Sequence, residues 1–555
     1  MLAKRPFSKA LLVGLLAGVF LAPAAVSAQE IVNIDGTDAT RVVIAPATSD
    51  IARLIKANLS AAYYGAANTA AYAEAQRLYY FYGARGFEPL WLTPGADGQA
   101  TFAPAGEKIL KVFADAELEG LRPADYLTPE LSLDGATNDP AGIAALEVAF
   151  TGATMSYAQN VYGGRVDPRT VSPNIDIRPR LVDQTKLLTE LAASDDPASI
   201  LAGLDPKHRE FVALKEALAK FYDSDEETDE KIQIPSGKTL RLGMIDERVP
   251  LLRKRLDVPA GADGNDAIYD ENVAAAVTAF QENLGLDADG VAGPATVAAL
   301  NGGSSVGKED IIANMERWRW MPPDLGKNNV FVNIPEFRLA VMHDGAPTYT
   351  TRVVVGKPAT QTPIFSDNIR QIVVNPYWNV PASIATNEIR PHLAANPGYL
   401  ASQNMELLYA GKVVNAAMFN WSNTSIDNFR VRQRPGGANA LGKIKFLFPN
   451  SHDVYLHDTP SKSLFGRSIR AYSHGCVRVQ NPMDFADALL VNEPSHLDSA
   501  KLESMYGPSE RWVNMETHVP VHIAYFTLRV DQDGTIRSYA DIYGHNKKLI
   551  EMLNS

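Results

Sequence analysis

The stretch Tyr472-Ser473-His474-Gly475-Cys476-Val477-Arg478 contains the only cysteine of the 555-residue chain. A lone thiol has no internal disulfide partner, so in an oxidising compartment it is either an inert buried group or a reactive one. The residues around it favour the reactive interpretation. Gly475 removes a side chain beside the thiol, and the backbone N–H groups of Gly475 and Cys476 are expected to form an oxyanion hole.

A second stretch, Tyr455-Leu456-His457-Asp458-Thr459-Pro460, supplies a base for this thiol. His457 ends a predicted strand, and the following loop lets Cys476 fold back beside its ring, so we expect His457 to act as general acid and base. Neighbouring side chains of a strand point to opposite faces. We therefore expect a backbone carbonyl or Ser473, rather than Asp458, to orient the ring.

The same residues also allow a metal site. Cys476, His474 and His457 are residue types that bind zinc. The chain has neither a His-Glu-x-x-His motif nor paired cysteines, so we expect no metal and no cofactor. His474 is then expected to form a wall of the site or its oxyanion loop. Geometry rather than sequence decides between His474 and His457 as the base.

The sequence around both stretches predicts a mainly β domain over residues 329–545. Runs of β-branched and aromatic residues recur there, and Asp533-Gly534 marks a hairpin turn. Residues 383–440 interrupt the strands with a polar, mixed stretch that is helical in part and too long for a simple connection. They predict an inserted capping subdomain.

Two further domains are predicted upstream. Residues 239–302 form short helices separated by turns at Asp289-Gly290 and Gly293-Pro294. With the string Ala276-Val277-Thr278-Ala279-Phe280-Gln281, this pattern resembles the small three-helix peptidoglycan-binding module found beside many wall enzymes. Residues 50–236 show apolar residues at helical spacing and predict an α-helical scaffold domain without candidate catalytic residues.

Length and charge limit the remaining possibilities. A chain of 555 residues exceeds a single core, so two to four domains are expected. The net charge of −12 argues against a nucleic-acid partner.

Residues 1–28 combine three basic residues, an apolar stretch and Val26-Ser27-Ala28, which is typical of a cleaved secretory signal peptide. We therefore expect export to the periplasm and association with the cell wall.

The Ser-His-Gly-Cys-Val-Arg string at 473–478 and the upstream Leu-His-Asp at 456–458 resemble the signature of YkuD-type L,D-transpeptidases. The order of domains resembles the long periplasmic branch of that family, with a helical scaffold, a peptidoglycan-binding module and a capped catalytic domain. The resemblance implies that Cys476 is the acyl-accepting nucleophile.

Arg478 closes the family's string and is a candidate for binding a substrate carboxylate, with a structural ion pair as the alternative. Tyr377 and Trp378 are candidates for lining the acyl site, with core packing as the alternative.

The resemblance also implies a reaction. A tetrapeptide stem of peptidoglycan acylates the cysteine, the terminal D-Ala leaves, and the diamino acid of a second stem resolves the thioester as a 3→3 cross-link. Carbapenem-type β-lactams are then expected covalent inhibitors. Three alternatives stay open: an L,D-carboxypeptidase with water as acceptor, attachment of a protein lysine to the wall, and a non-catalytic wall-binding scaffold. The presence of both Cys476 and His457 argues against the last.

Overall fold

The computed structural model describes residues 30–33, 41–66, 72–95, 99–133, 139–223, 232–235, 237–261, 264–283, 288–301 and 306–555. The predicted signal peptide at residues 1–28 lies outside them. The chain divides into two units. The first comprises Met1–Thr170, Arg178–Asp223 and Met315–Trp320, and the second comprises Val171–Ile177, Ser224–Asn314 and Met321–Ser555.

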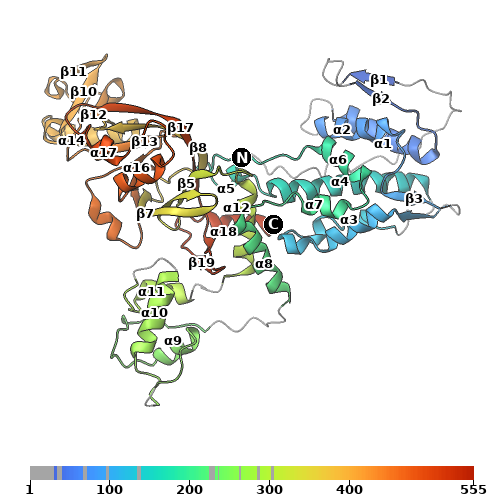
Figure 1. Ribbon diagram of the computed structural model, residues 1–555, viewed down its shortest axis with the longest axis horizontal. Helices are drawn as coiled ribbons and strands as arrows, with labels where there is room; N and C mark the ends of the chain where they lie inside the picture. The colour runs from blue at the N-terminus through green and yellow to red at the C-terminus, as the bar shows by residue number, and fades with distance from the viewer. Residues whose placement is uncertain are drawn as a thin grey trace. The chain divides into compact units, whose positions relative to one another are not determined.

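The first unit is mainly helical. Its helices are α1 (Asp50–Gly65), α2 (Tyr72–Ala84), α3 (Pro104–Ala114), α4 (Pro140–Gly163), α6 (Gln184–Ala193), α7 (Pro197–Ala202) and α8 (Arg209–Asp223), and its short hairpins are β1–β2 (Glu30–Asn33, Arg41–Ile44) and β3–β4 (Leu92–Pro94, Ala100–Phe102) (Figure 1). The side chain of Ser49 caps α1 by accepting from Ala52 N, and the face of α1 with Ala52, Ile55 and Leu59 is buried. The spacing of these apolar residues explains why this helix packs against α4.

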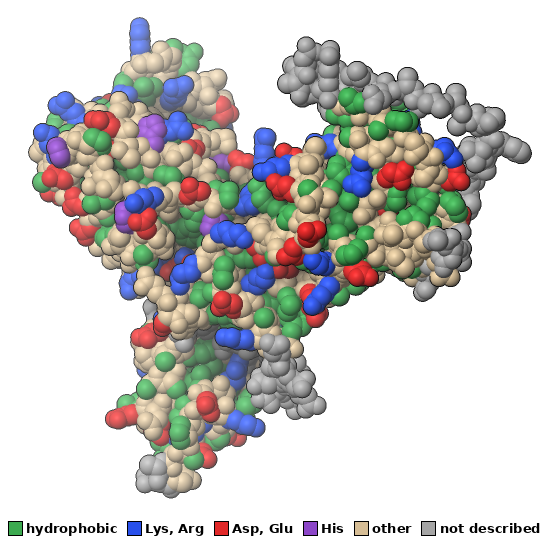
Figure 2. Space-filling model, turned by 45° about the vertical axis from the view of Figure 1, so that its right-hand side comes forward, with side chains coloured by type: hydrophobic (Ala, Val, Ile, Leu, Met, Phe, Trp, Pro, Cys, Tyr) green, Lys and Arg blue, Asp and Glu red, His purple; other side chains and the backbone are tan. Residues whose placement is uncertain are grey.

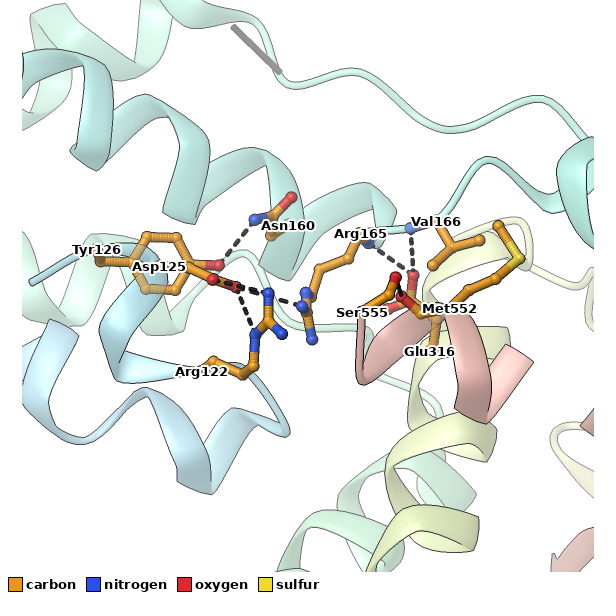
Figure 3. A network of polar contacts seen from close by, with 9 residues as sticks. All are labelled: Arg122, Asp125, Tyr126, Asn160, Arg165, Val166, Glu316, Met552 and Ser555. Atoms are coloured by element: carbon orange, nitrogen blue, oxygen red, sulfur yellow. Dashed lines mark hydrogen bonds and ion pairs between the residues drawn. The ribbon is translucent and has the colours of Figure 1, made fainter. Parts of the chain in front are cut away.

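Two carboxylates, the buried Glu316 and the exposed Asp125, fix loops of this unit. Glu316, in the part of α12 (Lys308–Trp320) that belongs to the first unit, accepts hydrogen bonds from the backbone N–H groups of Arg165 and Val166 (Figure 3). In the same view, Asp125 bridges Arg122 and Arg165. A buried carboxylate needs such partners to offset its lost hydration. These groups are already paired, so we assign them a structural role.

In the second unit, three helices surround a small core: α9 (Val249–Arg255), α10 (Glu271–Asn283) and α11 (Pro294–Asn301). Gln281, at the end of α10, holds the turn between α10 and α11, because its side chain accepts from Gly290 N and donates to Val291 O. Gly290 has a φ of +66° and lies against the backbone of α10, which a side chain would not permit. The three helices predicted for this segment are confirmed.

The C-terminal part of the second unit is built on a nine-stranded sheet in the order β15-β7-β16-β14-β13-β8-β17-β5-β6, and β6 also pairs with β7. The strands are β5 (Asn328–Asn333), β6 (Arg338–His343), β7 (Ala346–Gly356), β8 (Phe365–Val374), β13 (Ile444–Leu447), β14 (Leu456–His457), β15 (Ala471–Ser473), β16 (Val477–Val479) and β17 (Arg511–Ala524). The predicted hairpin at Asp533-Gly534 joins β18 (Leu528–Val530) to β19 (Ile536–Ser538). Short helices α16 (Pro482–Leu490), α17 (Ser499–Glu503) and α18 (His545–Leu553) accompany the strands.

Alternation along the central strands separates a core face from a polar face. Phe446 of β13 pairs with Leu456 of β14, which in turn pairs with Val477 of β16, and all three are buried. On this face Phe446 packs edge-on against Phe485 of α16. Burying one face fixes the register, so the residues between these apolar positions must point to the other face.

The segment predicted as a cap has a core of its own, formed by buried side chains such as Leu393, Leu407, Trp421 and Val431. Together with residues 378–382, which precede the predicted boundary at 383, it forms α13 (Ala382–Ile384), a π-helical turn (Ala385–Ile389), α14 (Arg390–Ala395), α15 (Tyr399–Ser402) and a four-stranded sheet in the order β11-β10-β12-β9. Its strands are β9 (Trp378–Asn379), β10 (Met405–Tyr409), β11 (Lys412–Val414) and β12 (Arg430–Gln433). The sequence did not predict this sheet, because its strands are only two to five residues long.

Side chains of both charge signs are interspersed over the face shown in Figure 2. Within the described ranges, no helix is both long and apolar enough to cross a bilayer. The predicted multidomain architecture, with a helical N-terminal region, a small three-helix module and a β-rich C-terminal domain, is confirmed.

Candidate active site

The ends of two neighbouring strands bring residues 455–460 and 472–478 together. β14 and β16 run parallel, with Leu456 opposite Val477 and His457 opposite Arg478. Cys476 immediately precedes β16 and is half-buried. Because Leu456 and Val477 point into the core, the side chains of His457 and Arg478 point to the other face. Cys476, two residues before Arg478, shares that face.

The loop that carries the thiol is held by Ser473 and Thr362. The buried Ser473 hydroxyl donates to Cys476 O and accepts from Gly475 N at 3.1 Å. The buried hydroxyl of Thr362 donates to Gly475 O at 2.8 Å. Gly475 has a φ of +123°, in the region that favours glycine, while a Cβ there would meet nothing closer than Gln361 O at 3.6 Å. Glycine is therefore required by the backbone conformation rather than by lack of space.

This geometry corrects two predictions from the sequence. The N–H of Gly475 donates to Ser473, so it does not point into an oxyanion hole in this structure. Among the described residues, Cys476 N has no hydrogen-bond partner, so it is the donor left for that role. Ser473 does not orient His457. Its hydroxyl shapes the nucleophile loop instead, because it bonds to two backbone groups of that loop, Cys476 O and Gly475 N.

A backbone carbonyl orients His457, which is the other predicted possibility. The ring Nδ1 hydrogen-bonds to Asp458 O, and since a carbonyl only accepts, Nδ1 carries the proton and Nε2 keeps a free lone pair. The Asp458 carboxylate points elsewhere, to Lys443 N and Lys462 Nζ, as strand alternation requires. Burial, Arg478 and Lys445 lower the pKa of His457 to about 3, so the imidazole is neutral at neutral pH.

The thiol is also neutral in the resting site. Burial raises the pKa of Cys476 to about 11, against smaller opposing effects of hydrogen bonds from Tyr455 and the charge of Arg478. The thiol makes a long contact of 3.8 Å to Asp453 O, and no hydrogen bond joins it to His457 within the described part of the chain. Catalytic hydrogen bonds are commonly loose before substrate binds. The resting pair is thus a thiol and a neutral imidazole rather than a preformed ion pair.

Sequence reasoning missed two residues of this face, Tyr455 and Lys445. Tyr455 directly precedes Leu456, the partner of Val477, so it lies beside Cys476, and its ring centre is 5.7 Å from that of His457. Lys445 stands directly opposite His457 across β13 and β14. Two sequence patterns could have identified them. Tyr455 is two residues before His457, so both point to the same face of a strand, and Lys445 is a single lysine between the apolar residues Ile444 and Phe446.

The remaining predicted residues lie toward the cap. His474 Nε2 is 2.8 Å from Glu388 Oε1 of the π-helical turn, so it contacts the cap rather than the thiol. The Arg432 guanidinium of β12 lies 4.4 Å over the Tyr377 ring, and Trp378 packs against the cap's core. His474, His457 and Cys476 form no metal-binding group in the described residues.

Comparison with known proteins agrees with this architecture. Residues 327–497 match the L,D-transpeptidase catalytic domain of the YkuD family, 248–300 match the "Putative peptidoglycan binding domain" and 76–218 match the scaffold domain. A curated "Putative L,D-transpeptidase" of Haemophilus influenzae is 34% identical over 245 residues, which cover 43% of this chain. The aligned part spans about half, 49%, of that relative.

Two solved L,D-transpeptidases are also similar. The enzyme from Stackebrandtia nassauensis is 16% identical, covering 55% of this chain and 98% of its own, with a TM-score of 0.20. Residues 123–326 of the enzyme from Xylanimonas cellulosilytica are 18% identical, covering 52% and 98%, with a TM-score of 0.17. TM-scores this low do not establish a shared fold, so the assignment depends on the sequence matches. The chain therefore carries, in order, a scaffold domain, a peptidoglycan-binding domain and an L,D-transpeptidase catalytic domain of the YkuD type.

Proposed function

We propose that this protein is an exported L,D-transpeptidase that forms 3→3 cross-links in peptidoglycan through a thioester on Cys476. The observation that carries the proposal is the placement of the chain's single thiol on a glycine loop, on the same sheet face as a neutral imidazole with a free Nε2. A nucleophile and a base arranged in this way are the minimum for acyl transfer.

In the first half-reaction, the Cys476 sulfur attacks the carbonyl carbon between the diamino acid and the terminal D-Ala of a tetrapeptide stem. The S–H proton passes to His457 Nε2 as the S–C bond forms. Collapse of the tetrahedral intermediate breaks the C–N bond, and His457 returns the proton to the leaving amine. Cys476 N is the donor proposed to stabilise the oxyanion. Because both groups start neutral, no buried ion pair has to be formed before substrate arrives.

In the second half-reaction, the side-chain amine of a diamino acid on another stem attacks the thioester. A new C–N bond forms, the C–S bond breaks, and the amine proton returns through His457 to the sulfur. Water as acceptor would give a carboxypeptidase, and a protein lysine would give wall attachment. The cap supports the amine acceptor, since a segment that contacts the nucleophile loop through His474 and Glu388 limits access of water to the thioester.

The other domains support the location of this activity. The peptidoglycan-binding domain would hold the enzyme on its polymeric substrate and so raise the local concentration of stems. Together with the signal peptide predicted at residues 1–28, it supports the proposal that the reaction takes place at the cell wall, in the periplasm. The proposed partners are peptidoglycan stems, with carbapenem-type β-lactams as covalent inhibitors.

The products formed from purified tetrapeptide stems test the proposal. Full-length protein is incubated with disaccharide-tetrapeptide, and the muropeptides are separated and identified by mass spectrometry. A dimer that has lost one D-Ala is expected, with the bond between two diamino acids shown by fragmentation. Monomeric tripeptide alone would identify water as the acceptor and contradict the cross-linking proposal. The Cys476→Ala variant is the control, because it should form neither product.

A further inference from the structure

A row of side chains crosses the sheet next to the thiol. Register pairs Trp512 of β17 with Val373 of β8, Val373 with Lys445 of β13, Lys445 with His457 of β14, and His457 with Arg478 of β16. Directly opposite residues of neighbouring strands point to the same face. Two cationic side chains, Lys445 and Arg478, therefore flank the proposed base on the face that carries the nucleophile.

Lys445 is buried without a partner. Only 7% of the residue is exposed, and in the described part of the chain the contacts of its ammonium are to two aromatic rings, with no hydrogen bond or ion pair. Its Nζ lies 5.4 Å from the centre of the Tyr455 ring and 5.5 Å from that of Trp512. These aromatic contacts stabilise a cation only modestly, and an ammonium on a side chain that is largely buried gains further from an anion or several acceptors.

The one carboxylate near Lys445 is already engaged. Glu510 accepts from Tyr377 N at 2.9 Å and from Trp512 Nε1 at 2.9 Å, and it makes no ion pair with Lys445 among the described residues. On the far side of His457, Nε of Arg478 is buried and also has no partner. The face thus presents two cations that its own residues leave without an anion. Burial of unpaired charge of this kind is characteristic of a binding site for an anionic group.

We infer that Lys445 binds the terminal carboxylate of the donor stem and so selects donors whose leaving residue ends in a free acid. The inference rests on the proposed acyl transfer at Cys476. In the donor, that carboxylate is two bonds from the nitrogen of the bond being broken, so it must lie close to the sulfur. Lys445 meets this requirement, because its ammonium lies over the ring of Tyr455, and Tyr455 and Cys476 directly precede the paired residues Leu456 and Val477.

Arg478 has a different place in this arrangement. It lies in β16, two residues after the thiol, and its charge favours the thiolate of Cys476. Lys445 is one strand beyond His457, on the side of Trp512, whose side chain is exposed. A leaving residue that extends from the sulfur past His457 would therefore bring its carboxylate to Lys445, where a charge-assisted hydrogen bond forms.

Two donors that differ only at the terminus test the inference: a tetrapeptide stem with a free C-terminal carboxylate, and the same stem with a C-terminal amide. The full-length wild type should prefer the acid by about 10- to 100-fold in kcat/KM, the effect of one hydrogen bond between charged groups. Lys445→Met should lower kcat/KM for the acid by that factor and leave the amide nearly unchanged. Lys445→Arg should restore most of the preference. Lys443→Met is the matched control, since Lys443 is exposed and lies over Tyr506.

Each outcome separates the inference from the proposed function. If the wild type uses both donors equally, or if folded Lys445→Met keeps the wild-type preference, the inference is overturned while acyl transfer stands. If Cys476→Ala still turns over the acid donor, the proposed function itself fails. The wild-type comparison decides the matter even if Lys445→Met does not fold, because it requires no variant.

Discussion

Replacement of Gly475 by alanine tests the backbone geometry of the nucleophile loop. The φ of Gly475 is +123°, which costs an alanine of order 1–3 kcal/mol. Space does not add to this cost, since the added Cβ would be 3.6 Å from its nearest neighbour, Gln361 O. If the loop relaxes to avoid the strain, Gly475 N leaves Ser473 and the sulfur moves with it.

We expect Gly475→Ala to slow acylation by about 5- to 150-fold, which is the same free energy expressed as a rate. The assay is the rate at which a carbapenem adduct appears in intact-mass spectra of the full-length protein. Gly466→Ala is the control in the same domain, because Gly466 has nothing within 4 Å of an added Cβ and does not have a positive φ. Equal acylation rates for Gly475→Ala and wild type would refute the proposed role of the loop conformation.

Three further predictions concern the residues around the thiol. Ser473→Ala leaves Gly475 N and Cys476 O without their buried partner, so the free energy of unfolding of the catalytic domain, measured by calorimetry, should fall by about 2–4 kcal/mol. Ser504→Ala alters an exposed hydroxyl and should change it by less than about 0.5 kcal/mol. Similar losses in both variants would contradict this prediction. Burial lowers the pKa of His457 from 6.5 to about 3, so its contribution to stability is complete above pH 6.5 and is lost as the pH falls toward 3, by up to roughly 5 kcal/mol. His457→Gln should remove that part of the pH dependence, and an unchanged acid profile would show that His457 is not its source. His474→Ala should keep the acylation rate within about threefold of wild type, because its ion-pair partner Glu388 is exposed. His457→Gln should slow acylation by about 100-fold or more. If His474→Ala were the slower variant instead, His474 would be the base.

The sequence was sufficient for the parts of the fold and the site that depend on local pattern. Alternation in Ile444-Lys445-Phe446 and Val477-Arg478-Val479 indicates which residues point to the apolar core and which to the other face, and the glycine loop with its serine and cysteine is contiguous. The three-helix module was predictable because its glycine turn and Gln281 lie close together in sequence.

What could not be predicted depends on contacts between distant residues. The parallel pairing of β14 with β16 brings Tyr455 to Cys476, and the pairing of β13 with β14 brings Lys445 to His457, but two-residue strands carry little sequence signal. The roles of Ser473 and Gly475 N were assigned wrongly for a similar reason. Sequence shows that a hydroxyl and an N–H are available, but only the three-dimensional loop shows that they bond to each other.

The most direct test of the account is the mass of the intact protein after incubation with a carbapenem. Wild type should gain the mass of one inhibitor molecule, and peptide mapping should place it on Cys476. The Cys476→Ala variant, folded to the same extent by circular dichroism, should gain none. An adduct of equal yield on Cys476→Ala, or one that maps to another residue of the wild type, would contradict the claim that Cys476 is the nucleophile.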